Sequence, residues 1–490
     1  MLFNSFEFLV LLAITLVLYY VPVPARLARV WQVGVLLSAS SIFYGWEDPR
    51  LLILLGVSCV FNAISVERIL SAKREERAVA AKRWLVWAIV LNLSFLAFFK
   101  YAGILLGTIP GVHSSAVAWV RSIPLPIGIS FYTFHAISLL VDVHRGNVSQ
   151  ETQRRLGRSG AGRAASLGDL SLYIVFFPQL VAGPIVKAHD FVDQIREKLW
   201  SNIDWTLVRR YLVTGYFLKI FVADNLAEQT VLLTVEGSLR TSGPISLMAM
   251  LYGYGLQIFA DFAGYSLIAI GLGLMFGYRL PENFRFPYLS LSITEFWRRW
   301  HLSLSSWLRE YLYIPLGGNR KGSGRTYFNL FLVMFLGGLW HGAEWKFALW
   351  GTLHGGLLAF ERLVFRSRAG SLASTGPWRW LRDGFRWAYA FHAVMFLWLT
   401  FLMPDMAHIR LFFEMMGSGG WSVKGQPVFA LLAYGGMAVL YHLWGWLQEH
   451  RPYWVKQAGN PWAEGIVHAV MLFLVITNPG APRGFIYFQF

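Results

Sequence analysis

Cysteine and charged side chains are both scarce in this chain. Cys59 is the single cysteine among 490 residues, which excludes a fold held together by internal disulfide bonds. We interpret it as a small packing residue in an apolar segment. Charged residues make up 14% of the sequence, against roughly 25% in soluble globular domains. An ordinary soluble domain is therefore excluded.

Several catalytic signatures are missing as well. The sequence has no G-x-S-x-G elbow of a serine hydrolase, no Walker A loop of an NTP-driven pump and no H-E-x-x-H zinc pair of a membrane protease. These three classes of protein lose support, and we expect no metal site.

Hydrophobic side chains dominate instead. They make up 56% of the chain, aromatic residues make up 17%, and the mean hydropathy is +0.47. Apolar stretches of about 18 to 22 residues recur along nearly the whole length, as a hydrocarbon core roughly 30 Å thick requires of a helix. We expect an all-α integral membrane protein that forms one multi-pass domain over residues 1–490. The expected spans are 5–22, 30–46, 50–66, 84–106, 125–143, 170–186, 207–234, 245–277, 328–340, 345–364, 385–403, 427–447 and 464–478.

Arginine and lysine, which give a net charge of +16, gather in alternate loops. The loop with Arg26 and Arg29 and the loops at 67–83 and 144–167 are basic, whereas the loops between them carry few charges. Basic loops of membrane proteins face the cytoplasm. The alternation predicts a protein of the cytoplasmic membrane with an outward-facing N-terminus, whose first helix is retained because no cleavage site follows it. Nucleic-acid binding is not needed to explain the charge.

Two of the expected spans are interrupted. The stretch VFFPQLVAGPIV contains two prolines and a glycine, and the segment 328–340 is short and ends in a Gly-Gly pair. Broken helices occur at membrane depth only where protein or a water-filled cavity covers the freed backbone. We therefore expect a central cavity. The absence of an internal repeat argues against an inverted-repeat transporter.

Two histidines, His301 in FWRRWHLSLSSW and His341 in GGLWHGAEW, each follow a tryptophan. Ionisable groups within a membrane are functional candidates, and histidine can accept and return a proton near neutral pH. Transfer of an acyl group from a thioester to a hydroxyl needs such a base. The alternative is that each imidazole bonds a backbone carbonyl in a packed bundle, and spacing alone does not separate the two interpretations.

Longer motifs make the chain recognisable. These are PLPIGISFYTFHAIS, FFPQLVAGPIVK, YGLQIFADFAGYSLIAIGLGLMFGYRLPENFRFPYLS, ITEFWRRWHLSLSSWLREYLYIPLGGNRKG, LWHGAEWKFALWGTLHG and the terminal FIYFQF. In this order they resemble the membrane-bound O-acyltransferase (MBOAT) family, and more narrowly its bacterial alginate O-acetyltransferase branch. The resemblance covers nearly the whole chain. It implies a ring of about eleven or more transmembrane helices, with re-entrant and interfacial helices, around a central tunnel.

The resemblance also assigns roles to residues. His341 takes the place of the catalytic histidine and would act as the general base, whereas His301 takes the second polar position and would orient or polarise the acyl carbonyl. If the donor is acetyl-CoA, a basic and aromatic run would face its phosphates. That run contains Arg298, Arg299, Trp300, Arg309 and Arg320. For each arginine, anchoring at the cytoplasmic interface is the alternative.

Other polar groups receive weaker assignments. We expect His354 to be structural and Asp261 to be a hydrogen-bond partner between helices, while His135 could line the same cavity as His341. Glu344 and Lys346 receive no role.

The expected function is transfer of acetyl groups from a cytoplasmic donor across the inner membrane for O-acetylation of an exported polysaccharide, most of all alginate. The resemblance implies periplasmic partner proteins of the SGNH serine-hydrolase type. Leu267 departs from the branch, because an acidic residue is usual after GYS there. Acetylation of cellulose or peptidoglycan, D-alanyl transfer from a carrier protein, and a transporter without chemistry remain alternatives.

Overall fold

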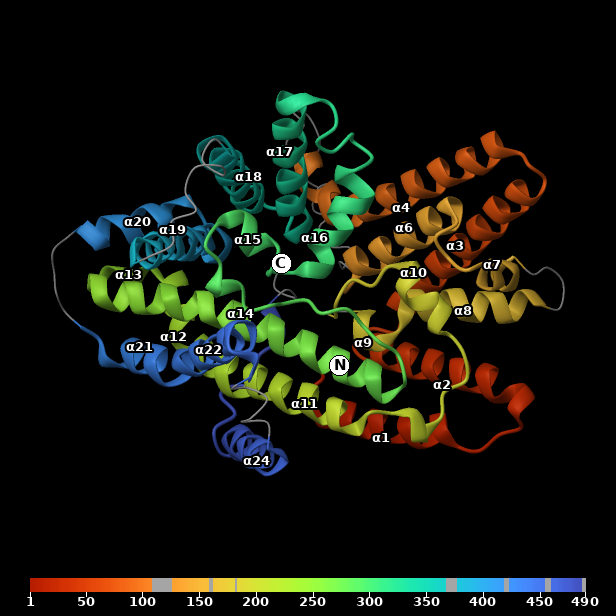
Figure 1. The fold of residues 1–490 in the computed structure, drawn as a ribbon, viewed down its shortest axis with the longest axis horizontal. Coiled ribbons are helices and arrows are strands. Elements are labelled where there is room, and N and C mark those ends of the chain that lie inside the picture. The colour runs from red at the N-terminus through yellow and green to blue at the C-terminus, as the bar shows by residue number, and fades with distance from the viewer. Residues whose placement is uncertain are drawn as a thin grey trace. The chain divides into compact units, whose positions relative to one another are not determined.

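The computed structural model describes residues 1–107, 126–157, 162–180, 183–366, 377–417, 423–453 and 460–486. All regular secondary structure in these residues is helical (Figure 1). The chain divides into two units, one made of residues 1–211 and 268–281 and the other of residues 212–267 and 282–490. The expectation of an all-α protein is confirmed, and the single domain expected for 1–490 stays a prediction.

The first unit begins with four long helices. Its helices are α1 (Phe6–Tyr20), α2 (Ala25–Gly45), α3 (Leu51–Arg74), α4 (Ala78–Gly107), α6 (Ile129–Arg145), α7 (Gln150–Leu156), α8 (Arg163–Val175), α9 (Phe177–Leu180), α10 (Ala188–Phe191) and most of α11 (Trp205–Tyr216). A buried carboxylate, Asp169, helps to hold these helices together. It pairs with Arg29 of α2 at 2.6 Å and with Arg155 of α7 at 3.0 Å.

The second unit contains both histidines singled out in the sequence. Its helices are a π-helix (Phe217–Ala223), α12 (Asp224–Thr230), α13 (Glu236–Arg240), most of α14 (Pro244–Met275), α15 (Ile293–Trp297), α16 (Leu302–Leu308), a π-helix (Arg309–Tyr313), α17 (Gly322–His341), α18 (Trp345–Arg366), α19 (Pro377–Leu402), α20 (Met406–Gly417), α21 (Gly425–Ala430), a π-helix (Leu431–Gly435), α22 (Gly436–His450) and α24 (Pro461–Thr477). Short 3₁₀ turns lie at 192–194 and 200–202 in the first unit and at 231–234 and 287–289 in the second.

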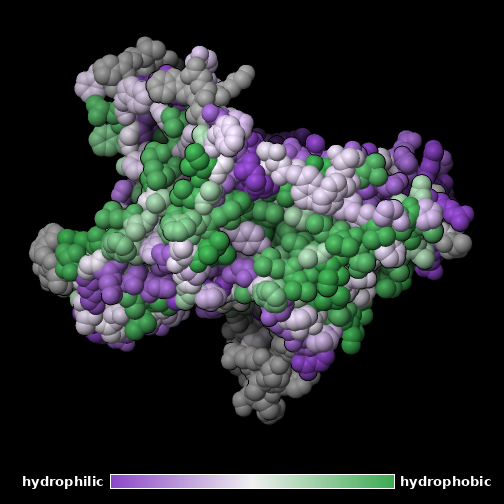
Figure 2. All heavy atoms as spheres, turned by 90° about the horizontal axis from the view of Figure 1, so that it is seen from below, coloured by the Kyte–Doolittle hydropathy of each residue, from purple (hydrophilic) through white to green (hydrophobic). Residues whose placement is uncertain are grey.

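Six of the described helices are long and apolar enough to cross a membrane. They lie at Ala25–Gly45, Leu51–Arg74, Ala78–Gly103, Pro244–Met275, Trp378–Leu402 and Gly425–His450, and two shorter apolar helices lie at Phe6–Tyr20 and Pro461–Thr477. Figure 2 shows hydrophobic side chains spread widely over one face, as a surface in contact with lipid requires. The protein is therefore a multi-pass membrane protein, whereas the ring of eleven or more spans and the tunnel stay predictions.

The helix break predicted in VFFPQLVAGPIV is present. α8 ends at Val175, α9 is a single turn, and residues 184–187 are not helical. Side chains satisfy backbone groups around the break, because the Tyr173 hydroxyl donates to the Val186 carbonyl at 2.8 Å and His135 Nε2 accepts from the Val186 N–H at 3.4 Å. His135 thus supports the broken segment of the first unit, and its place in one cavity with His341 stays a prediction.

The second predicted interruption, at 328–340, is absent. α17 runs unbroken through Gly337 and Gly338 to His341. A Cβ added at Gly338 would lie 2.2 Å from the Phe347 carbonyl oxygen of α18, and one added at Gly351 would lie 2.3 Å from the Met334 carbonyl oxygen of α17. The glycines therefore let two helices approach closely instead of ending one of them.

Candidate active site

His301 sits at the start of α16 in a left-handed backbone conformation, with φ of 47°. This region is unfavourable for a residue with a Cβ, and such outliers concentrate at functional sites. The side chain is fully buried. Neighbouring backbone holds the turn, because the Leu302 N–H donates to the Asn283 carbonyl at 2.9 Å.

The amide of Asn283 fixes the orientation of the His301 ring. Asn283 Oδ1 lies 2.9 Å from His301 Nδ1 and also accepts hydrogen bonds from the N–H and hydroxyl of Ser303. Its Nδ2 donates to the Ser266 hydroxyl at 3.0 Å. Since Oδ1 is the acceptor here, Nδ1 of His301 carries the proton and Nε2 has the lone pair.

His301 Nε2 has no hydrogen-bond partner among the residues that the structure describes. His301 lies in the connection between α15 and α16, outside the candidate spans, and burial lowers the pKa of its imidazole to about 3. The ring is therefore neutral at physiological pH. A neutral ring in this tautomer offers Nε2 as an acceptor for a hydroxyl and cannot donate to an acyl carbonyl.

His341 is the last residue of α17 and is 5% exposed. The close approach of α17 and α18 places its imidazole 5.1 Å from the indole of Trp350, between ring centroids. Phe401 of α19 lies on the ring as well, at 5.4 Å. Three helices thus surround His341 with aromatic rings, which exclude water from its neighbourhood.

Trp340 brings the two histidines into one cluster. Its indole lies 6.1 Å from the His301 ring and 5.0 Å from the His341 ring, between centroids. The ring of Phe262, on α14, also packs against His301, at 4.6 Å between centroids. The structure therefore places together the two residues that the sequence selected as catalytic candidates.

His354 joins this cluster from α18. It contacts Trp350 at 4.7 Å, and its Nδ1 accepts a hydrogen bond from Trp297 Nε1 at 3.3 Å. Trp350 thus touches both His341 and His354. This contact to α15 fits the structural role expected for His354.

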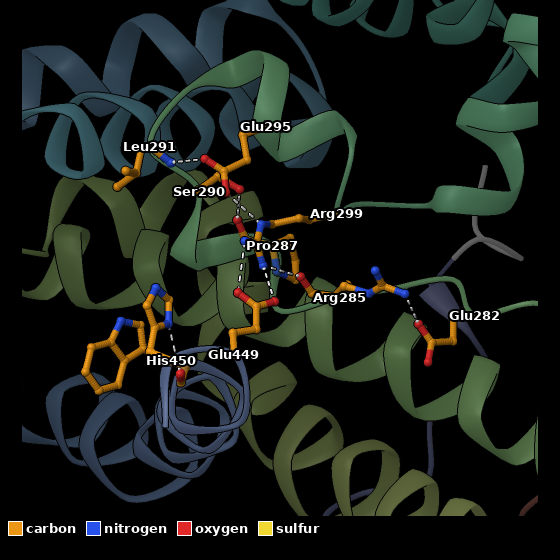
Figure 3. A network of polar contacts seen from close by, with 10 residues as sticks. Glu282, Arg285, Pro287, Ser290, Leu291, Glu295, Arg299, Glu449 and His450 are labelled. Carbon is orange, nitrogen blue, oxygen red and sulfur yellow. Dashed lines mark hydrogen bonds and ion pairs between the residues drawn. The ribbon is translucent and has the colours of Figure 1, made fainter. Parts of the chain in front are cut away.

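The residues expected to hold the donor do not gather in one place. Arg298 is exposed, whereas Trp300 is 1% exposed and packs against other aromatic rings. Arg299 is engaged in ion pairs with Glu295 at 2.9 Å and with Glu449 of α22 at 2.8 Å, as Figure 3 shows. Arg299 therefore ties α15 to α22.

Arg309 and Arg320, in contrast, line the same pocket. Both are exposed and line a pocket of about 270 Å³, together with Tyr313 and Asn319. Its lining has no acidic residue. Two guanidinium groups beside an aromatic ring suit a phosphate-bearing ligand.

Sequence reasoning missed a buried group of charges in the second unit. Lys219 lies 2.7 Å from Asp224 and 2.7 Å from Asp261, and all three side chains are at most 4% exposed. Asp261 therefore joins α14 to a neighbouring helix, as expected. An isolated lysine in an apolar stretch, KIFVADN, was the signal that could have pointed to this group.

Glu344 lies in the connection between α17 and α18, and Lys346 lies at the start of α18. Lys346 Nζ is 3.6 Å from Glu344 and donates to the Met403 carbonyl at 3.3 Å. These contacts are structural.

The sequence of this chain is similar to the sequences of known proteins. The model of the MBOAT, membrane-bound O-acyltransferase, family matches residues 129–404, which include both histidines. A protein of Azotobacter vinelandii named probable alginate O-acetylase is 38% identical over 90% of this chain and 84% of its own length. A protein of the same name from Pseudomonas putida is 34% identical over the full length of both chains. A peptidoglycan O-acetyltransferase of Helicobacter pylori is 33% identical over 79% of this chain and 74% of its own.

Proposed function

Because the chain belongs to the membrane-bound O-acyltransferase family and is an O-acyltransferase, we propose that it moves acetyl groups from a cytoplasmic donor for O-acetylation of an exported polysaccharide, alginate. The observation that carries this proposal is the buried cluster in which Trp340 contacts both His301 and His341. The relatives named alginate O-acetylase support the choice of polymer.

In the proposed reaction His341 is the general base. It takes the proton of an acceptor hydroxyl as the hydroxyl oxygen attacks the thioester carbonyl. The tetrahedral intermediate collapses, the carbon–sulfur bond breaks, and the leaving thiolate takes the proton back from the imidazolium. The products are an acetyl ester and a free thiol, so no net proton is consumed.

His301 has a positioning part in this proposal. Its Nε2 lone pair would accept a hydrogen bond from a second hydroxyl of the acceptor and so position the attacking hydroxyl, whose own proton goes to His341. The resemblance implies that His301 orients or polarises the acyl carbonyl, and this proposal replaces both roles, because Nε2 in this tautomer has no proton to donate to a carbonyl.

The donor in this proposal is acetyl-CoA, and the pocket of Arg309 and Arg320 would hold its phosphates. The pocket offers two cationic side chains and the ring of Tyr313, and its lining lacks an acid that would repel phosphate. Arg299 is left out of the donor site because it is paired with two glutamates, and Trp300 because it packs among aromatic rings. A contact of Arg298 with the donor stays a prediction.

The cellular setting is proposed as the bacterial inner membrane, with a periplasmic N-terminus and basic loops facing the cytoplasm. Periplasmic SGNH-type partner proteins would complete transfer onto the polymer.

The test measures acetyl transfer from labelled acetyl-CoA. Membranes that contain the chain are mixed with a periplasmic extract of an alginate-producing bacterium. We expect label in ester linkage on alginate, released by mild base. Label on peptidoglycan or cellulose alone would replace the proposed polymer but keep the acetyl transfer. Turnover only with a D-alanyl carrier protein would overturn the acetyl donor, and carriage of the donor without ester formation would show a transporter.

A further inference from the structure

Three cationic side chains lie close together in the first unit, two on the segment 194–200 and one just after α14. Arg196 and Arg279 are exposed, and Lys198 is half-buried with its ammonium 4.7 Å from the centre of the Tyr278 ring. Lys198 lies outside the candidate spans, and burial together with the charges of Arg196 and Arg279 lowers its pKa to about 8. The three cations are therefore close enough to repel one another.

No carboxylate neutralises this cationic group within the described part of the chain. Neither Lys198 nor the two arginines form an ion pair there. Glu197 is exposed and forms no ion pair either, and Asp169 is already paired with two other arginines. Three cations beside one exposed carboxylate leave this surface positive, so it suits an anionic ligand.

Two glutamines fix the backbone that carries the cations. Gln32 of α2 donates to the Lys198 carbonyl at 2.8 Å and accepts from the Lys198 N–H at 2.9 Å. Gln194 pairs in the same way with Arg279, accepting from its N–H at 2.8 Å and donating to its carbonyl at 3.0 Å. A Cβ added at Gly277 would lie 2.8 Å from Lys198 Cδ, so this glycine leaves room for the lysine stem. The cationic group is thus held in place by specific contacts.

Exposed apolar side chains lie beside the cations. Leu199 and Trp200 directly follow Lys198, and each is 52% exposed. Trp200 packs on Tyr20, the last residue of the apolar helix α1, at 5.3 Å between ring centroids. Tryptophan and tyrosine gather where a membrane span leaves the hydrocarbon core. We therefore place this segment at a membrane interface, where exposed apolar side chains meet acyl chains and adjacent cations reach the headgroups.

The apolar neighbours decide between two sources of phosphate. A free phosphate would use the cations but not Leu199 and Trp200, whereas a phospholipid would contact both kinds of side chain. Basic pockets beside membrane spans are suited to anionic headgroups. Charge and apolar surface together favour the lipid.

We propose that Arg196, Lys198 and Arg279 form a binding site for the phosphate of an anionic phospholipid, whose acyl chains lie against Leu199 and Trp200. The site goes beyond the acetyl transfer proposed above and does not depend on it. The bound lipid ties this segment of the first unit to the membrane surface.

Native mass spectrometry of the full-length chain in an uncharged detergent tests the proposal. The delipidated protein is titrated separately with phosphatidylglycerol, with zwitterionic phosphatidylcholine and with inorganic phosphate. The wild type should bind phosphatidylglycerol about tenfold or more tightly than either of the other two. Inorganic phosphate that binds as tightly as phosphatidylglycerol would show a site for the free anion and overturn the lipid assignment.

Substitution of one cation gives the size of the effect. Arg279→Gln should weaken phosphatidylglycerol about fivefold, the fold-change that corresponds to about 1 kcal/mol for one cation near an anionic surface. Arg83→Gln is the matched control, because Arg83 is an exposed arginine of the same unit beside another exposed tryptophan, Trp84. It removes the same charge outside the site and should bind as the wild type does.

A variant that keeps every charge separates a built site from general attraction to a basic surface. Gln32→Leu releases the Lys198 backbone and should also weaken phosphatidylglycerol. Arg196→Gln changes an exposed position and should weaken the lipid about fivefold, so the test stays decisive if Gln32→Leu fails to fold. Equal affinity of the wild type for the two lipids, or equal weakening by Arg279→Gln and Arg83→Gln, would overturn the proposal.

Discussion

The indole of Trp340 packs against the imidazole of His301 at a centroid distance of 6.1 Å, although α17 carries the first residue and the start of α16 carries the second. Because Trp340 precedes His341, the same indole fixes where the end of α17 lies relative to His301. The indole of Trp340 thus links the positions of the two imidazoles.

Replacing Trp340 with leucine should lower acetyl transfer on the order of 100-fold, because a shift of about 1 Å in reacting groups has that effect. Affinity for the acetyl donor should stay unchanged, since Trp340 does not line the pocket of Arg309 and Arg320. Initial rates and donor titration on the same preparation check this. Trp340→Phe should recover part of the rate, and a Trp340→Leu variant with wild-type turnover would show that the indole does not position the histidines.

Asn283→Ala removes the acceptor that holds the proton on His301 Nδ1. The expected loss in transfer rate is roughly tenfold, from one buried hydrogen bond of about 1 to 1.5 kcal/mol. Asn283→Asp keeps an acceptor at the same place and should retain more activity than the alanine variant. The order of these two variants in a rate assay is the measurement, and the reverse order would contradict the tautomer assigned to His301.

Gly351→Ala should destabilise the protein by about 1 to 3 kcal/mol, since its Cβ would overlap the Met334 carbonyl of α17. Gly356→Ala, on the same helix, is the matched control because a Cβ there meets nothing within 4 Å. Thermal unfolding in detergent should show a lower midpoint for Gly351→Ala and an unchanged or higher one for Gly356→Ala. Equal midpoints would mean that α17 and α18 do not pack through these glycines.

The stability of the folded protein should depend on pH through His189. The hydrogen bond from its ring to Asp142, 2.8 Å long, raises the pKa of His189 above its usual value of 6.5. A raised pKa means that the folded state binds the proton more tightly, so this stabilisation is complete below pH 6.5 and is lost as pH rises through the raised pKa. The unfolding midpoint of the wild type should therefore fall over that range relative to His189→Gln. Parallel pH profiles for the two proteins would exclude the interaction as a contributor.

Parts of the fold could be read from the sequence because they depend on local pattern. Long apolar runs predicted α2, α3, α4 and α14, and the prolines of VFFPQLVAGPIV predicted the helix break, since proline lacks the N–H that continues a helix. The helix break predicted from the Gly337-Gly338 pair was wrong. Glycine weakens an isolated helix, but it also allows another helix to approach closely. Only the position of α18 decides between these effects.

The two histidines of the candidate site could be predicted from the sequence, whereas the residues that hold them in place could not. His301 and His341 stood out as ionisable groups within apolar surroundings. Asn283, which sets the tautomer of His301, and the pairing of Lys219 with Asp261 depend on contacts between segments distant in the sequence. Trp300 is as buried as its neighbour His301 and packs on Phe284 and Trp398, contacts that the motif alone does not reveal.

The most direct test of the account is the rate of polymer acetylation by His341→Ala, compared with His392→Ala, an exposed histidine on α19. Both variants are expressed in alginate-producing cells lacking the native chain, with membrane levels matched by immunoblot, and acetyl esters are measured on the exported polymer. The account predicts a loss of about 100-fold or more for His341→Ala, the contribution of a general base, and a normal level for His392→Ala. Polymer acetylated to the normal level by His341→Ala would contradict it.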